Sequence, residues 1–458
     1  MARVKIANAK FIMTMNASRR IISDGTIIFD DDRITHVGKA VDLANAPAER
    51  VIDGREMVIT PGFVNGHMHI SYAHATRGIF PDDLSPRDYL ANVFALQQSM
   101  TEEEEHDTSL LGITELLRGG TTTFVDPGST RFLDACMDAY ERAGCRIVVG
   151  RQVTDRTNPL NLPVYETAEA VALTGRTIDA YDGGLDGRVH AWAMPFSVDY
   201  CSPALLRELK ALADSMNTRL TLHHGNGPAT VRAFLENYNV RPTMWLEDQG
   251  ILGNNVVLSH IIGLDGKEVA SMARTNTYGI LCPTAAMKMG SGLSQQGMAP
   301  EMLRSGVTLG LGTDAGNNSN LIETLRSMYL IAILFKDART DTRMIPAEAA
   351  LEMATIGGAT ALGLDNEIGS IEADKKADLV MFDTRRAQWR TLFNPVNSLV
   401  YNADGRSVHT VIVNGRTVVE GGEATFVDEW ELAQRVQRHG ESMLERTNTS
   451  FPPRWPVI

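Results

Sequence analysis

Two histidines separated by one residue, His67 and His69, follow an apolar run over residues 58–64. Side chains at positions i and i+2 of a strand point to the same face, so both imidazoles can approach one ion. Imidazole and carboxylate ligands suit Zn²⁺ or another first-row divalent ion, which makes bound water acidic enough to supply hydroxide near neutral pH. Further candidate residues end later apolar runs, namely His223, His260 and Asp314. The sequence therefore predicts a hydrolytic metal site.

The cysteines do not contribute to this site. Cys136, Cys145, Cys201 and Cys282 stand singly, without a CxxC pair. Neither a disulfide framework nor a thiolate zinc site is expected from such spacing, and each cysteine is interpreted as a small buried apolar residue. Any metal must then be held by histidine and carboxylate.

The composition is that of an acidic globular protein. Its 458 residues carry 43 Lys plus Arg against 56 Asp plus Glu, and the net charge of −13 argues against nucleic acid as a partner. No run of about 18 apolar residues appears, and the N-terminus lacks the apolar core of a secretory signal. We expect a cytoplasmic protein that acts on a small-molecule substrate and has no membrane partner.

Eight apolar runs separated by helical patterns must position the candidate residues. This alternation is typical of repeated βα units and predicts an α/β fold, a (β/α)8 TIM barrel whose functional residues lie at the carboxyl ends of the strands. An open Rossmann sheet is the alternative, but no GxGxxG motif follows an early strand. The expected strands are Val58–Val64, Thr121–Val125, Arg146–Gly150, Val189–Met194, Arg219–Leu222, Asn255–Ser259, Tyr278–Leu281 and Val307–Gly312.

Short alternating runs at both ends of the chain predict a second, smaller domain. Strands are expected between residues 4 and 58 and again over 377–383, 408–415 and 417–420. The simplest arrangement is one β-sandwich built from both chain ends. The predicted domains are therefore residues 1–58 and 366–458 for the composite sandwich with a terminal helix, and 59–365 for the barrel.

Several motifs end the expected strands or follow the barrel. They are Pro61 to His69, His223-His-Gly-Asn226, Ser259-His260, Gly312-Thr-Asp314, Ala354-Thr355, Ala361-Leu-Gly-Leu364, Ile368-Gly-Ser-Ile-Glu372 and Lys376-Ala-Asp-Leu379. In combination these motifs resemble the amidohydrolase superfamily, in its branch of cytosine-deaminase-like and chlorohydrolase-like enzymes, over essentially the whole chain.

The resemblance implies a single divalent metal held by His67, His69, His223 and Asp314, with His260 close to the reacting carbonyl or water. The expected fourth strand, residues 189–194, contains no Lys, unlike the branches that hold two metals with a carboxylated lysine. Zn²⁺ is the preferred ion, although these ligands also accept Fe²⁺, Mn²⁺ or Co²⁺. In this scheme Asp314 accepts the proton of water, and His260 orients the water or stabilises the oxyanion.

One residue departs from the deaminase pattern. Deaminases of this branch carry His-x-x-Glu at the fifth strand, and the Glu protonates a ring nitrogen of a cyclic amidine. Asn226 stands at that place. An amide cannot transfer a proton at neutral pH, although it can donate a hydrogen bond. We therefore expect cleavage of a urea, carbamate or thiocarbamate carbonyl, with His260, Asp314 and Asn226 as catalytic residues. A loop-capping role for Asn226 remains open, and the neighbouring His224 is expected to pack or to support the site.

Two loops look most similar to the subgroup that hydrolyses phenylurea and thiocarbamate compounds. They are Ser71-Tyr-Ala-His-Ala-Thr-Arg-Gly-Ile-Phe-Pro-Asp-Asp83 and Gly316-Asn-Asn-Ser-Asn320. The metal motif of that subgroup can depart from HxH, whereas this chain keeps both histidines. Candidate substrate contacts near the strand ends are Tyr72, His74, Arg151, Gln152, Met287 and Asn317.

Two other functions compete with this hypothesis. One is an aminohydrolase or dechlorinase of a nitrogen heterocycle, of the deaminase or triazine hydrolase type, in which Asn226 and water replace the missing acid. The other is a catalytically silent barrel that serves as an oligomeric scaffold, but such a barrel would not need every expected ligand. By analogy with similar folds, a homo-oligomer is expected.

Overall fold

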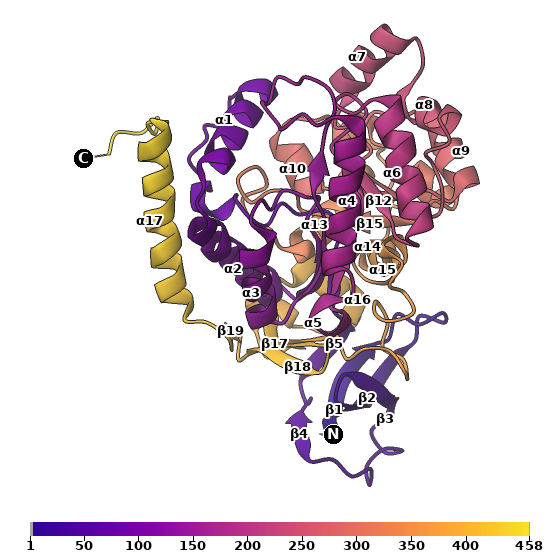
Figure 1. Ribbon diagram of the computed structural model, residues 1–458. Helices are drawn as coiled ribbons and strands as arrows, with labels where there is room; N and C mark the ends of the chain where they lie inside the picture. The colour runs from indigo at the N-terminus through magenta and orange to yellow at the C-terminus, as the bar shows by residue number, and fades with distance from the viewer. Residues whose placement is uncertain (1–2, 458) are drawn as a thin grey trace.

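Eight parallel strands form the centre of the computed structural model, which describes residues 3–457 (Figure 1). The sheet runs in the order β10-β8-β7-β6-β15-β14-β13-β12, and bridges from Ala193 to Leu220 and from Ser197 to His223 join its two edges. The predicted barrel is therefore confirmed. Its strands are β6 (Phe63–Asn65), β7 (Thr121–Val125), β8 (Arg146–Val149), β10 (Val189–Ala191), β12 (Leu220–His224), β13 (Val256–His260), β14 (Tyr278–Leu281) and β15 (Leu309–Leu311).

Two of the expected strands are divided in the structure. The run over 58–64 splits at Gly62, because β5 (Met57–Pro61) belongs to the terminal sheet and β6 to the barrel. A Cβ at Gly62 would lie 2.0 Å from Thr122 Oγ1, so only glycine allows the chain to cross here. The run over 189–194 splits into β10 and β11 (Met194–Pro195), which pairs with β9 (Gln152–Val153).

The strands from both chain ends form one nine-stranded sheet, with the order β19-β18-β17-β16-β5-β1-β2-β3 and β4 paired with β1. Strand β5 joins the two ends, because it pairs in parallel with β1 and antiparallel with β16. The composite domain is thus a continuous sheet below the barrel in Figure 1. Its other strands are β1 (Arg3–Met13), β2 (Ile21–Asp30), β3 (Arg33–Lys39), β4 (Arg50–Asp53), β16 (Leu379–Asp383), β17 (Val408–Val413), β18 (Arg416–Glu420) and β19 (Glu423–Ala424).

Helices surround the barrel, and the last one returns to its side. Helix α17 packs beside α2, where Arg435 bonds to Asp107 at 2.8 Å and Arg446 to Glu104 at 2.6 Å (Figure 1). The main helices are α1 (Pro86–Ser99), α2 (Glu102–Arg118), α3 (Leu133–Ala143), α4 (Thr167–Tyr181), α6 (Pro203–Ser215), α7 (Pro228–Tyr238), α8 (Pro242–Asp248), α9 (Gly266–Thr275), α10 (Pro283–Lys288), α12 (Ala299–Arg304), α13 (Thr324–Ala338), α14 (Ala347–Ala354), α15 (Ile356–Leu362), α16 (Pro395–Asn402) and α17 (Glu429–Thr447).

Two general expectations can be compared with the structure. The four cysteines are buried and unpaired, as their isolated positions predicted. Among residues 3–457, no helix combines the length and the apolar character needed to cross a lipid bilayer.

A buried ion pair connects the barrel to the terminal sheet. Arg146 on β8 lies 3.2 Å from Asp378, just before β16, and both side chains are 2% exposed. Asp378 also accepts the backbone N–H of Asn414 at 2.7 Å. We expect Asp378→Ala to lower the free energy of unfolding by about 3–5 kcal/mol, because it leaves a buried guanidinium without its partner.

Urea unfolding of Asp378→Ala and of a surface control variant measures this effect. Arg304→Ala serves as the control, because Arg304 pairs with Glu301 at the surface and its side chain is 60% exposed. The control should cost under about 1 kcal/mol. Equal losses in the two variants would show that burial does not govern the strength of the Arg146–Asp378 pair.

Candidate active site

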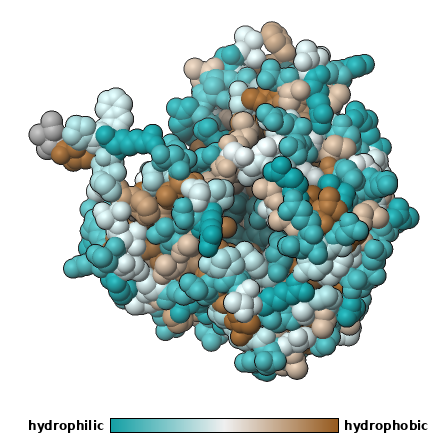
Figure 2. All heavy atoms as spheres, turned by 90° about the horizontal axis from the view of Figure 1, so that it is seen from above, coloured by the Kyte–Doolittle hydropathy of each residue, from teal (hydrophilic) through white to brown (hydrophobic). Residues whose placement is uncertain are grey.

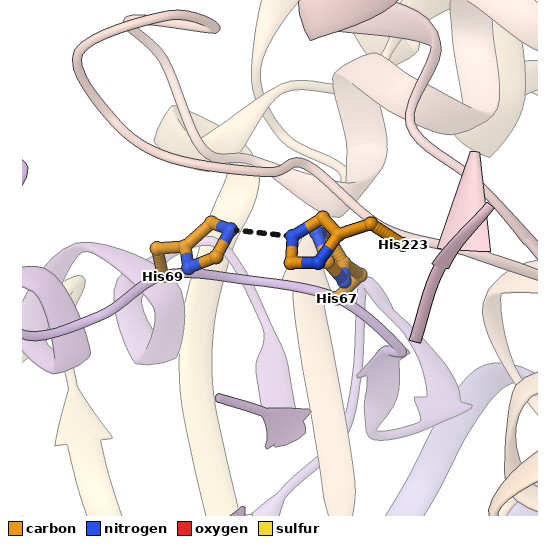
Figure 3. Close-up of side chains that lie close together, drawn as sticks. All are labelled: His67, His69 and His223. Carbon is orange, nitrogen blue, oxygen red and sulfur yellow. Dashed lines mark hydrogen bonds between the residues drawn. The ribbon is translucent and has the colours of Figure 1, made fainter. Parts of the chain in front are cut away.

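The candidate metal ligands converge at the carboxyl end of the barrel. His67 and His69 follow β6, whereas His223 lies in β12. The Nε2 atoms of His69 and His223 are 3.2 Å apart, as Figure 3 shows, and His67 lies beside them. Asp314 follows β15, and its Oδ1 is 3.4 Å from His69 Nε2 and 3.8 Å from His67 Nε2. The structure therefore brings together all four residues of the predicted ligand set.

The chemistry of these atoms fits a divalent cation. Both ring nitrogens of His67 and the Nδ1 atom of His69 are buried without a hydrogen-bond partner. Burial, reinforced by the neighbouring imidazoles, holds the pKa of His67 well below its usual range, and burial likewise lowers the pKa of His223. The rings of His67 and His223 are thus neutral near pH 7 and can each present a nitrogen lone pair. A cation at their centre would give these lone pairs a common partner.

Backbone contacts hold the ligands in place. The backbone N–H of Asp314 donates to the carbonyl of His67 at 3.0 Å, which ties the loop after β15 to the loop after β6. His223 Nδ1 bonds to the carbonyl of Phe196 at 3.0 Å, leaving Nε2 to face the site. Asp314 accepts hydrogen bonds from the Ala315 backbone and from Asn318 Nδ2, each at 2.8 Å. Such partners fix the orientation of metal ligands.

His260 lies in the same cluster and belongs to a second group of residues that could hold a metal ion. It ends β13, its ring centroid is 4.8 Å from that of His67, and His67, His260 and Asp314 can also present ligand atoms within 4.8 Å of one another. Both His260 (φ 79°) and Asp314 (φ 63°) have a left-handed backbone, a conformation that is uncommon outside glycine and recurs at active sites. Burial lowers the pKa of His260. Its role beside the metal, rather than on it, stays a prediction.

A cavity of about 400 Å³ opens above the cluster. Figure 2 looks onto this end of the molecule and shows a hollow near the middle of the face. Four site residues line it: His69, His223, His260 and Asp314. One wall is apolar and aromatic, since the ring of Phe196 lies 4.8 Å from the ring of His223 and 6.1 Å from that of Phe94 on α1. The volume of the cavity falls in the range of about 300–1,000 Å³ that is typical of small-molecule sites.

Of the six predicted substrate contacts, only Tyr72 lines this cavity. His74 is buried and bonds to Glu115 at 3.1 Å, and Asn317 accepts a hydrogen bond from Tyr89 at 2.8 Å. These two residues support loops around the site. The remaining three lie away from the cavity lining: Arg151, which bonds to the carbonyl of Arg131, Gln152 in β9, and Met287, which is exposed. Strand-end position alone did not distinguish lining residues from supporting ones.

The two residues that follow His223 have different surroundings. His224 is buried and bonds through Nε2 to Thr243 on α8 at 2.8 Å, consistent with the supporting role expected for it. Asn226 lines the cavity but is exposed. It therefore lies at the open side of the cavity, where water can reach it.

Several cavity residues were not predicted from the sequence. The loop after β11 contributes Ser197, Asp199 and Tyr200, and helix α1 contributes its apolar face. Asp199 could have been found, because a carboxylate follows the fourth barrel strand just as Asp314 follows the eighth. The contribution of α1 could not have been found, since it depends on how the inserted segment before this helix folds over the barrel.

Comparison with known proteins identifies the family. The amidohydrolase family model matches residues 58–418, which include every candidate metal ligand. The chain therefore belongs to the amidohydrolase family. It is a hydrolase that acts on C–N bonds other than peptide bonds.

Two named relatives and one solved structure are similar to this chain over nearly its whole length. The chain is 30% identical to 5'-deoxyadenosine deaminase of Methanobrevibacter smithii over 423 residues, 92% of this chain and 94% of the relative. It is 27% identical to 5-methylthioadenosine/S-adenosylhomocysteine deaminase of Thermoanaerobacter pseudethanolicus over 436 residues, 95% and 98% of the two chains. Among solved structures, a zinc-bound adenosine deaminase from Xanthomonas campestris has a TM-score of 0.88 at 24% identity, covering 96% of this chain and 98% of that one.

These relatives overturn the expected cleavage of a urea, carbamate or thiocarbamate. Full-length relatives are named as deaminases of adenosine derivatives, and the resemblance to the phenylurea subgroup gains no support. The prediction rested on Asn226 alone, although the cavity also holds the carboxyl groups of Asp314 and Asp199.

Proposed function

We propose that this protein is a metal-dependent aminohydrolase that releases ammonia from an amino-substituted nitrogen heterocycle of the adenine nucleoside class. The observation that carries this proposal is the convergence of three imidazoles and Asp314 at the base of a small-molecule cavity. The deaminase names of the full-length relatives support the choice of reaction.

The residues that would hold the metal are His67, His69, His223 and Asp314. Zn²⁺ is the ion this donor set favours, and when bound it would lower the pKa of a coordinated water to about 7. Burial acts to raise the pKa of Asp314, but the nearby imidazoles of His260 and His69 lower it overall. Asp314 is therefore ionised near neutral pH and can accept a proton from water.

The reaction adds water across a C=N bond and expels the exocyclic amine. Water loses one proton to Asp314 as its oxygen bonds to the amino-bearing carbon, and the adjacent ring nitrogen gains a proton. Asp314 then returns its proton to the amine, which leaves as ammonia, and the hydroxyl of the adduct becomes the carbonyl of a lactam. His260 lines the cavity beside Asp314 and can hydrogen-bond to the attacking oxygen.

The cavity lining suits an uncharged planar substrate. The aromatic rings of Phe196 and Phe94 form a surface against which a heterocycle can stack. No Lys or Arg is found among the described residues that line the cavity. A substrate phosphate would find no cation there, so we expect a nucleoside to be preferred over a nucleotide.

A panel assay of ammonia release tests this function. The Zn²⁺-loaded protein is offered adenosine, 5'-deoxyadenosine, 5'-methylthioadenosine, adenosine 5'-monophosphate and N-phenylurea, with aniline measured in parallel. We expect ammonia from at least one nucleoside, with kcat/KM for the monophosphate at least about tenfold lower, since an unpaired charge in such a site costs about 1.4 kcal/mol or more. Aniline release from phenylurea without ammonia release from any nucleoside would overturn the proposal.

A further inference from the structure

The proposed reaction needs a proton donor for the ring nitrogen, and the usual position for it is occupied by Asn226. The amide of Asn226 cannot deliver a proton near neutral pH. Of the described residues lining the cavity, only Asp314 and Asp199 carry a carboxyl group. Asp314 belongs to the metal ligand set, which leaves Asp199 as the carboxyl with no function yet assigned.

The backbone brings Asp199 to the site. Ser197 forms a parallel bridge with His223, and the Phe196 carbonyl accepts a hydrogen bond from the same histidine. Two residues further along each segment lie Asp199 and Gly225, the residue before Asn226. The chain continues from this bridge into the same cavity on both sides, because Asp199 and Asn226 both line it.

The carboxyl of Asp199 is free to meet a ligand. Within residues 3–457, the structure gives Asp199 neither a hydrogen bond nor an ion pair, although the residue is half-buried. Burial raises its pKa, and Arg156, whose Nη1 bonds to Tyr238 at 2.7 Å, partly opposes this effect. Tyr200, the other titratable neighbour, has its own pKa raised by burial and by Asp199. A carboxyl whose pKa burial raises, and which has no hydrogen-bond partner among the described residues, is suited to proton donation.

The other polar groups of the cavity are less suited to this step. Burial holds the pKa of Tyr72 and of Tyr89 far above 10, so neither gives up a proton readily. Tyr89 already donates to Asn317. His260 is neutral, because burial lowers its pKa, and it lies within the metal cluster.

We propose that Asp199 is the acid that protonates the ring nitrogen of the heterocycle, the role that a Glu at the position of Asn226 plays in deaminases of this branch. This role rests on the proposed aminohydrolase function and supplies the proton that the reaction requires at the ring nitrogen. Asp199 donates its proton to the ring nitrogen as water adds to the neighbouring carbon. It regains a proton from the hydroxyl of the adduct when the C=O bond forms and ammonia leaves. No oxidant, reductant or further reactant is required.

Four variants test the assignment with 5'-deoxyadenosine as substrate: Asp199→Asn, Asp199→Glu, the double variant Asp199→Asn with Asn226→Glu, and the control Asp179→Asn. Asp179 is an exposed acid on α4, so its variant repeats the change of charge away from the cavity. We expect Asp199→Asn to lower kcat by about 10²- to 10⁴-fold with little change in KM, because a proton donor acts in the transition state. Asp199→Glu should retain more activity, and Asn226→Glu should restore at least about tenfold in the double variant.

Two readouts separate proton donation from a structural role. Because the acid works only when protonated, kcat/KM of the wild type should fall as pH rises above the pKa of Asp199, and this decline should disappear in Asp199→Asn. Zinc content and the Kd of 5'-deoxyadenosine for the metal-free protein should stay within about threefold of the wild type.

The inference and the proposed function fail in different ways. Ammonia release by Asp199→Asn within about threefold of the wild type, with an unchanged pH profile, would overturn the role of Asp199 and leave the aminohydrolase intact. Loss of zinc or of folding in Asp199→Asn, together with an inactive double variant, would assign Asp199 to the scaffold and also overturn the inference. Absence of ammonia release from the wild type would overturn both.

Discussion

Asp314→Asn is expected to lower kcat/KM for ammonia release by about 10³- to 10⁴-fold, because one side chain provides both the proton acceptor and a metal ligand. Asn cannot accept the proton of water. The hydrogen bonds from Ala315 and Asn318, each 2.8 Å long, orient a carboxylate, whereas an amide at this position would turn its own NH2 group toward one of these two donors. The variant should therefore lose activity even when zinc is supplied in excess.

The control for this variant is Asn318→Ala. It removes one hydrogen bond from Asp314 but keeps the carboxylate, so we expect a loss of about 10- to 100-fold, the usual effect of removing an outer partner of a metal ligand. Steady-state kinetics at saturating zinc compares the two. Equal losses in both variants would contradict the role of Asp314 as proton acceptor.

His69→Ala is expected to abolish metal binding and with it about 10³-fold or more of the activity. Its Nε2 lies 3.2 Å from that of His223 and 3.4 Å from Asp314 Oδ1, at the centre of the ligand set. A bound metal contributes several kcal/mol of transition-state stabilisation, and each 1.36 kcal/mol changes the rate by about tenfold. Elemental analysis after dialysis should find close to one equivalent of metal in the wild type and almost none in this variant.

His260→Ala is the informative partner of that experiment. If His260 acts on water or on the substrate, its removal lowers kcat and spares the metal content. The structure also places His260 where it could ligate, together with His67 and Asp314. Loss of metal from His260→Ala equal to that from His69→Ala would move His260 into the ligand set.

The local chemistry of the site could be predicted from sequence because strand periodicity and strand ends are local features. His67 and His69 share a face since they are two residues apart, and Asp314 was recognised as the residue after an apolar run. These positions depend on the chain within a few residues. The barrel itself followed from the alternation of strands and helices.

The cavity could not be predicted in the same way, because its walls come from segments far apart in the chain. The ring centroids of Phe94 and Phe196 are 6.1 Å apart, yet about a hundred residues separate the two in sequence. Met287 illustrates the same limit from the other side. It follows a barrel strand but is exposed, whereas its neighbours Ala286 and Met289 line the cavity.

The substrate prediction failed for a related reason. Asn226 was judged alone, and the exposed amide was taken to set the chemistry of the whole site. Asp199 reaches the same cavity from the neighbouring element, through the pairing of Ser197 with His223. That pairing is a tertiary feature with no trace in the residues around Asn226.

The measurement that tests the central claim most directly is zinc titration of the metal-free protein with 5'-deoxyadenosine present and ammonia release followed. We expect no ammonia without metal, a rate that rises linearly with added zinc, and a plateau near one equivalent per chain. Ammonia release that is independent of zinc, or a plateau only at two equivalents, would contradict a single-metal aminohydrolase site built from His67, His69, His223 and Asp314.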